Sequence, residues 1–414
     1  MPRRFNSGRF FVVLLSVVLI GAAVVAAVYG PSLIAYRNGG FNLMALPTLA
    51  DAATVESSLL PLLEPVSQSD GSYPELAGRL ATLLEQRIGR QPVEVRGIYM
   101  TGYTAGSTSR VDALIKLIDE TELNAVVIDI KEDTGQISYR MDEPKVEATP
   151  GAAVPKIRDI DELLSKLHAH GIYPIARIVT FKDNVFANAN PDLAVHTSAG
   201  GVWRDRTGQG WLNPYKKETW DYAIAVAKNA VKHGFREIQF DYVRFPSDGN
   251  VKDMVFPGTD ERTHREVIRD FLKYANEQLT PLGVFVSADV FGLVTAAKDD
   301  LTIGQQYEDI IANVDYVCPM VYPSHYGPGN YGLPDPNRAP YETVLRAMED
   351  ALRRQGDSKA IVRPWLQDFS LGYKYGPAEV RAQIKAVYDA GLKEWILWNP
   401  YNKYTEGALE KVGE

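Results

Sequence analysis

The strongest constraint on the fold is a repeat in which short apolar runs alternate with helical stretches from residue 93 to near the end of the chain. Each run is rich in β-branched and aromatic residues and ends in polar ones, which is typical of strands that lead into helices. We expect strands at 95–101, 125–131, 173–180, 237–245, 284–291, 316–322, 361–368 and 394–399. Helices are expected at 110–120, 157–170, 217–232, 262–279, 304–313, 341–354 and 377–390, and 405–412 would supply the last one. Such a series over about 320 residues predicts an α/β fold, a (β/α)8 TIM barrel, at residues 93–414.

A doubly wound open sheet is the alternative interpretation of the same pattern. That fold usually carries a glycine-rich phosphate-binding turn after its first strand. Here the corresponding residues 102–106 read GYTAG and do not form G-x-G-x-x-G. The barrel is therefore the preferred architecture.

The first 36 residues carry a separate signal. Residues 10–29 contain no charged side chain, and three arginines precede them. A helix of that length spans about 30 Å, the thickness of a bilayer core. Because arginines favour the cytoplasmic side, we expect residues 1–36 to form a cytoplasmic tip and a single-pass transmembrane signal anchor in the cell membrane, with the barrel outside the cytoplasm. A cleaved signal peptide, which would give a secreted protein, is the alternative.

Residues 37–92 differ in character from both neighbours. Scattered prolines and a Ser/Asp/Gly run at 67–72 predict an irregular stalk, within which 74–88 has the apolar spacing of a short helix.

Across the whole chain, 52 acidic and 44 basic residues give a net charge of −8, which excludes a broadly basic nucleic-acid binder. The single cysteine, Cys318, cannot form an internal disulfide. Nothing in the pattern predicts an oligomeric state.

Two aspartates, Asp241 and Asp289, stand near the ends of neighbouring predicted strands. Barrel active sites gather at the carboxyl ends of the strands, and adjacent strands lie about 4.8 Å apart. Two carboxylates within roughly 5–10 Å of each other can hydrolyse a glycoside, since one attacks or activates water while the other protonates the leaving oxygen. We therefore expect both to be catalytic. The alternative is that each is a structural aspartate, paired with Arg177 or Arg244 or capping a backbone turn.

Polar and aromatic side chains near the other strand ends are candidates for binding a carbohydrate. Flat rings stack on the apolar faces of sugars, while charged and amide groups bond the hydroxyls. The candidate substrate-binding residues are Asp129, Lys131, Arg177, Trp203, Tyr322, Trp365, Gln367, Asp368, Trp398 and Asn399. For Asp129, a structural ion pair with Lys131 or Arg177 is an equal alternative.

Other chemistries find less support in the sequence. Among the histidines only His325 is near a strand end, which argues against a histidine-rich zinc site. No G-x-S-x-G elbow is present, which argues against a serine esterase. We therefore expect neither a metal nor a cofactor.

Four motifs carry a family resemblance: VRGIYMT at 95–101, VVIDIKEDTG at 126–135, FDYVRFP at 240–246 and SADVFG at 287–292. Over about residues 93–404 the chain resembles a bacterial family of predicted glycoside hydrolases, (β/α)8 barrels that are often exported. The resemblance implies a retaining arrangement similar to the alpha-amylase and alpha-galactosidase barrels. Their strand-four nucleophile matches Asp241, and the strand-five acid/base of the amylase-like members matches Asp289. The chain departs from the amylase pattern at Gln239, where those members have arginine, and by ending strand five in Asp rather than Glu.

Together these observations predict a membrane-anchored, outward-facing glycosidase that acts on an oligo- or polysaccharide. A barrel that binds cell-envelope glycan without cleaving it is the first alternative, because binding needs the aromatic rings but not an acid of raised pKa. A metal-assisted polysaccharide deacetylase using Asp129, Asp241 and His325 is the second, weakened by the lack of a histidine pair.

Overall fold

The computed structural model describes residues 90–412. The predicted membrane segment at 10–29 and the predicted short helix at 74–88 lie outside the described residues. Within residues 90–412, no helix combines the length and the apolar character that crossing a membrane requires.

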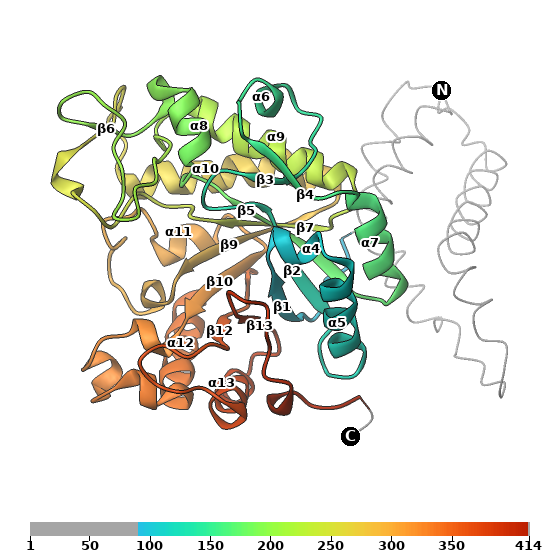
Figure 1. Cartoon of the computed structure of the whole chain (residues 1–414). Coiled ribbons are helices and arrows are strands. Elements are labelled where there is room, and N and C mark those ends of the chain that lie inside the picture. Colours follow the sequence, from blue (N-terminus) through green and yellow to red (C-terminus); the bar gives the residue numbers. More distant parts are fainter. Residues whose placement is uncertain (1–89, 413–414) are drawn as a thin grey trace, which may run out of the picture. The chain divides into compact units, whose positions relative to one another are not determined.

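A closed parallel barrel forms the centre of the described region (Figure 1). Its strands are β1 (Arg96–Met100), β2 (Ala125–Lys131), β5 (Tyr173–Val179), β7 (Glu237–Asp241), β9 (Phe285–Phe291), β10 (Tyr316–Val321), β12 (Trp365–Gln367) and β13 (Trp395–Trp398). The barrel closes because β1 pairs in parallel with both β2 and β13. The (β/α)8 prediction is confirmed.

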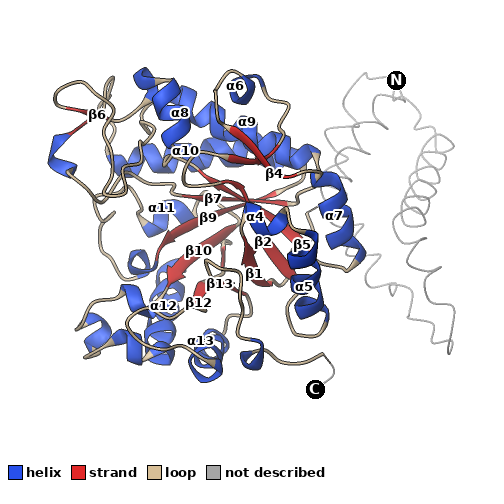
Figure 2. Cartoon of the chain, viewed as in Figure 1, coloured by secondary structure: helices blue, strands red, loops and turns tan. Residues whose placement is uncertain are grey.

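Helices surround the barrel as expected (Figure 2). The longer ones are α5 (Thr108–Asp119), α7 (Ile160–Ala169), α9 (Lys217–Lys232), α10 (His264–Leu279), α12 (Pro340–Gln355) and α13 (Pro377–Asp389). The shorter ones are α4 (Gly102–Ala105), α6 (Pro144–Glu147), α8 (Asn184–Ala189) and α11 (Tyr307–Ile311). Local sequence fixes several boundaries: Thr263 and Glu266 form a reciprocal capping box at the start of α10, and Pro377 opens α13.

The expected helix at 405–412 is wrong. Only a 3-10 turn forms there, at Glu406–Ala408. The Thr405 N–H and hydroxyl both donate to the Asp368 carboxylate instead, which anchors this segment to the end of β12. Eight residues containing a glycine are also too few to offset the cost of helix nucleation.

Two expected strands differ from the structure. The seventh is interrupted at Arg363 and Pro364, leaving β11 (Ile361–Val362) and β12, because proline has no N–H to donate to a sheet. The fourth ends at Asp241 rather than at residue 245, because Tyr242 takes a left-handed conformation with φ of 48°.

The strands β3 (Ile137–Tyr139) and β4 (Ala153–Ile157) were not predicted, and they extend the sheet beside β2. A further antiparallel pair joins two long loops, at β6 (His196–Thr197) and β8 (Met254–Val255).

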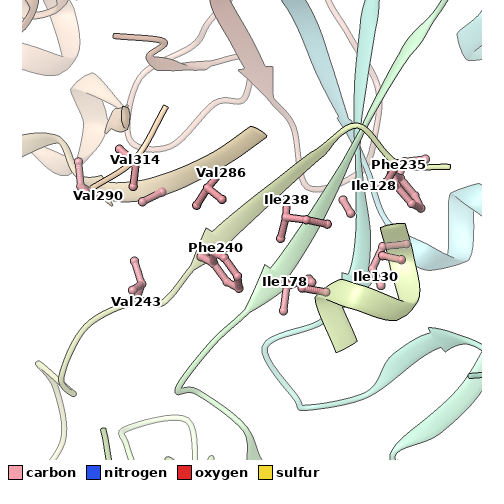
Figure 3. Packing of buried hydrophobic residues seen from close by; sticks show 14 of the residues in the cluster. Ile128, Ile130, Ile178, Phe235, Ile238, Phe240, Val243, Val286, Val290 and Val314 are labelled. Carbon is pink, nitrogen blue, oxygen red and sulfur yellow. The ribbon is translucent and has the colours of Figure 1, made fainter. Parts of the chain in front are cut away.

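Alternating side chains divide each barrel strand between two environments. The outward positions form the apolar layer between barrel and helices, in which Ile178, Ile238, Phe240 and Val286 lie close together (Figure 3). The inward positions carry the polar groups. At the amino end of the barrel the Arg363 guanidinium, with no exposed surface, bonds the Glu237 and Glu394 carboxylates, each at 2.7 Å.

We expect Arg363→Met to lower the free energy of unfolding by about 3–5 kcal/mol, because two buried carboxylates lose their shared cation. Urea denaturation measures this loss. The control is Arg265→Met, which breaks a half-exposed pair with Asp309 and should cost no more than about 1 kcal/mol. Equal losses in both variants would contradict a stabilising role for this cluster.

Candidate active site

A cavity of about 520 Å³ opens at the carboxyl ends of the barrel strands. Six of the residues predicted from the sequence line it: Arg177, Asp241, Asp289, Tyr322, Trp365 and Trp398. They come from β5, β7, β9, the end of β10, β12 and β13, so the barrel brings together side chains as far apart in the sequence as Arg177 and Trp398. The cluster forms because the carboxyl ends of the successive parallel strands meet at one end of the barrel.

Arg177 connects the two carboxylates nearest to it. Its Nε donates to Asp241 Oδ2 at 3.0 Å and its Nη2 to the same oxygen at 2.5 Å, while Nη1 binds Asp129 Oδ1. The other oxygen of Asp241 accepts from the Tyr242 backbone N–H at 2.6 Å. All of these side chains are buried, and Asp241 is only 5% exposed. Asp241 is therefore fixed at the end of β7 as the partner of a cation.

Asp289 occupies the equivalent level on the next strand. In the β7–β9 register Gln239 lies opposite Ser287 and Phe240 opposite Ala288, so Asp241 and Asp289 come next, side by side. The Trp365 indole N–H donates to Asp289 Oδ1 at 2.7 Å, and Oδ2 has no hydrogen-bond partner among the described residues. Burial raises the pKa of Asp289 well above its usual value, and the charge of Asp241 raises it further. The site thus pairs a carboxylate held by a cation with one that favours its protonated form.

Asp129 lies one level deeper, opposite Arg177 in the β2–β5 register. It binds both Arg177 and the Tyr99 hydroxyl, and it does not line the cavity. Burial raises its pKa, while Arg177 and Tyr99 act in the opposite direction. Its contacts are those of a residue that positions Arg177.

Aromatic rings form one wall of the cavity. Trp398 stacks on Tyr99 with ring centroids 4.0 Å apart, and Trp365 meets Trp398 edge to face at 5.5 Å. Tyr322 lies 6.5 Å from Trp398. Such a wall offers flat apolar surfaces beside the carboxylates, as sugar binding requires.

Two further residues, Tyr242 and Arg244, line the cavity because Tyr242 has a left-handed backbone conformation. In a regular strand Val243 would share the inward face of Asp241. The positive φ reverses the alternation, so Val243 packs in the outer apolar layer while Tyr242 and Arg244 line the cavity. A non-glycine residue at positive φ costs energy and carries no clear sequence signal. Phe291 of β9, Met320 of β10, and His325 and Tyr326, which follow β10, also line the cavity.

Besides Asp129, five predicted binding residues do not line the cavity: Lys131, Trp203, Gln367, Asp368 and Asn399. A register shift after Asp129 accompanies the turn of Lys131 toward Asp183, which its Nζ contacts at 2.8 Å. The Trp203 indole is buried and donates to the Asn250 carbonyl. Gln367 accepts from the Ser324 N–H, and Asn399 donates to the Asp368 carbonyl. These side chains bond the loops to one another.

The three residues of the deacetylase alternative do not form a metal centre in the described part of the chain. Across residues 90–412, no three or more His, Cys, Asp or Glu side chains are grouped to hold a metal ion. Asp129 and Asp241 both bind the Arg177 guanidinium, which already supplies their positive partner.

Residues 97–404 match a family model described as "Putative glycosyl hydrolase domain". The chain belongs to this family. Among solved structures, a hypothetical protein from Ruminiclostridium thermocellum ATCC 27405 is 44% identical, with coverage of 47% of this chain and 97% of that one and a TM-score of 0.44. The glycoside hydrolase domain of PgaB (BpsB) from Bordetella bronchiseptica is 11% identical, with coverage of 74% and 94% and a TM-score of 0.54, and it shares the fold. No curated protein matches.

For this glycosyl hydrolase domain we expect Asp241→Asn to lower the pKa of Asp289. The substitution removes the neighbouring negative charge and leaves Arg177 free to favour the Asp289 anion, whereas the effect of burial remains. Carbon-13 NMR titration of labelled aspartate carboxyls measures the shift, with Asp289→Asn identifying the resonance. Asp309→Asn, in α11, removes a carboxylate that is paired with Arg265 and does not line the cavity; it is the control and should leave the titration unchanged. An unchanged or higher Asp289 pKa in Asp241→Asn would show that the two carboxyls are not coupled.

Proposed function

We propose that this domain hydrolyses glycosidic bonds of an oligo- or polysaccharide by a retaining mechanism. Asp241 is the nucleophile and Asp289 the general acid/base. The observation that carries the proposal is the unequal pair at the cavity floor: Arg177 binds Asp241, while burial and the charge of Asp241 raise the pKa of Asp289. Retaining glycosidases need this division between one ionised and one protonated carboxyl group.

In the first step Asp289 gives its proton to the glycosidic oxygen while Asp241 attacks the anomeric carbon. The bond to the leaving sugar breaks, and a glycosyl–Asp241 ester forms. Asp289, now ionised, takes a proton from water, whose oxygen attacks the anomeric carbon and releases Asp241. Neighbouring strands about 4.8 Å apart agree with the spacing of about 5–5.5 Å that direct attack needs.

Other groups around the cavity have roles in the same reaction. The Trp365 N–H favours the Asp289 anion, which helps the acid to release its proton. Arg177 fixes the direction in which Asp241 faces, and Asp129 with Tyr99 holds Arg177 from below. Trp398 and Tyr322 provide the surface on which a sugar ring rests.

Variants of the two carboxyls test these roles against panels of polysaccharides and aryl glycosides. Asp241→Asn should lower kcat/KM by at least about 10³-fold on every substrate that the unmodified chain cleaves, with thermal stability retained. Asp289→Asn should lose about 10²–10⁴-fold on sugars with poor leaving groups but much less on dinitrophenyl glycosides, whose leaving group needs no proton. Proton NMR of the first product should show retained anomeric configuration.

The control for this series is Asp309→Asn, a surface carboxylate paired with Arg265, which should behave as the unmodified chain. Normal turnover in Asp241→Asn would overturn the nucleophile assignment. An inverted product would instead assign Asp241 as the base that activates water. A chain that binds glycans tightly and cleaves none would favour the binding-only alternative.

We propose in addition that the barrel is exported and tethered by residues 10–29, which carry no charge and follow three arginines. The full chain expressed with a carboxyl-terminal tag in a bacterial host should remain with carbonate-washed membranes, and protease added to spheroplasts should degrade the tag. A variant lacking residues 1–36 should be soluble and protected. A protected tag on the full chain would contradict this orientation.

A further inference from the structure

Arg244 is a buried cation at the cavity with no carboxylate partner in the described region. Its side chain is 7% exposed, yet it lines the same cavity as Asp241 and Asp289. Three rings surround its guanidinium carbon, those of Phe291 at 4.6 Å, Trp211 at 4.9 Å and Tyr242 at 5.0 Å. These contacts hold the guanidinium plane without neutralising its charge.

The Nη1 atom of this guanidinium donates hydrogen bonds to described residues, whereas the Nε/Nη2 edge donates none. Nη1 donates to the Phe245 carbonyl at 2.9 Å and to Ser247 Oγ at 3.2 Å, which fixes the orientation of the group. No described residue accepts a hydrogen bond from Nε or Nη2. Neither atom is fully buried, so both keep some accessible surface. Because Arg244 lines the cavity, this edge can be reached from it.

Elsewhere in the described residues, several arginines bind a carboxylate through the Nε/Nη2 edge. Arg354 donates from both atoms to Glu308 at 2.7 Å each, and Arg262 donates to Asp260 at 3.0 and 2.7 Å. Arg177 uses the same two atoms on Asp241. The planar fork matches the two oxygens of a carboxylate, so Arg244 presents an empty carboxylate-binding edge.

The acids nearby do not fill that edge. Asp241 is engaged by Arg177, and Asp289 is bonded to Trp365 with its pKa raised. Burial lowers the pKa of Arg244, whereas the charges of Asp241, Asp248 and Asp205 favour its cation at longer range. Asp248 also lines the cavity, but none of these three carboxylates forms an ion pair with Arg244 in the described region. His325 also lines the cavity, and burial lowers its pKa, so it adds no fixed charge at neutral pH.

We propose that Arg244 receives the carboxylate of an acidic sugar unit, so that the substrate of this domain is an anionic glycan cleaved beside a carboxylate-bearing residue. The inference rests on the proposed hydrolase function and adds its substrate class. A ligand carboxylate supplies the counter-ion that a buried guanidinium needs, and a neutral or aminated sugar leaves that need unmet.

The test uses the full chain carrying Asp289→Asn, so that ligands stay intact, and calorimetry on matched pairs. The members of each pair differ in one kind of group: tetragalacturonate and its fully methylated ester, a glucuronate-bearing xylo-oligosaccharide and its carboxyl-reduced form, and a neutral oligosaccharide with and without a sulfate ester. At least one carboxylate should bind about tenfold or more tightly than its neutral partner. Adding Arg244→Gln should abolish that preference while affinity for the neutral partner stays within about threefold.

Two further variants separate recognition from folding. Arg244→Lys keeps the charge and loses the fork, so a reduced but measurable preference is expected. Arg265→Gln removes an arginine whose same edge binds Asp309 on the outer surface, and the preference should be unchanged. In the chain without substitutions at Arg244, free glucuronate should compete with the bound acid and its methyl ester should not.

The inference is overturned if no carboxylate binds more tightly than its neutral partner, or if Arg244→Gln keeps the preference. Preference for the sulfate ester alone would overturn the carboxylate assignment. Cleavage of neutral glycans without any acid preference would leave the hydrolase proposal standing and remove this one. Acid preference that depends on Arg244, in a chain that cleaves none of the acidic glycans, would support this inference and contradict the hydrolase proposal.

Discussion

The buried guanidinium of Arg177 is the interaction on which the arrangement of the site depends. It lies inside the barrel, binds Asp129 on β2 and Asp241 on β7, and so connects three neighbouring strands. A charge at this depth is tolerated because carboxylates on both sides satisfy it. Arg177 forms an ion pair with Asp241 and not with Asp289. The two aspartates therefore have different electrostatic surroundings, although their side chains are chemically identical.

The two ends of the barrel use buried arginines in different ways. Arg363 at the amino end is fully enclosed and bonded to two glutamates, an arrangement that holds the strands together. Arg177 and Arg244 at the carboxyl end reach the cavity, where their remaining surface is available to a ligand. Stability and chemistry are therefore separated along the barrel axis, as is general for this fold.

The strained backbone of Tyr242, the residue after Asp241, determines which side chains line the cavity. Tyr242 has a φ of 48°, and its N–H donates to Asp241. The same turn brings Arg244 to the cavity, where a continuous strand would have directed it to the opposite face. A single backbone reversal thus sets both the hydrogen bonding of Asp241, the proposed nucleophile, and the position of the Arg244 charge at the cavity.

Periodicity in the sequence determined the barrel, most helix positions, and the placement of Asp241 and Asp289 at strand ends, because burial on one face imposes a pattern that is local in the chain. The same pattern suggested Lys131, Trp203, Gln367, Asp368 and Asn399 as binding residues. Only the tertiary structure directed these side chains into loop and core contacts, and only it paired Arg177 with Asp241 and raised the pKa of Asp289. Burial, backbone reversal and long-range charge depend on neighbours distant in sequence, and no local pattern encodes them.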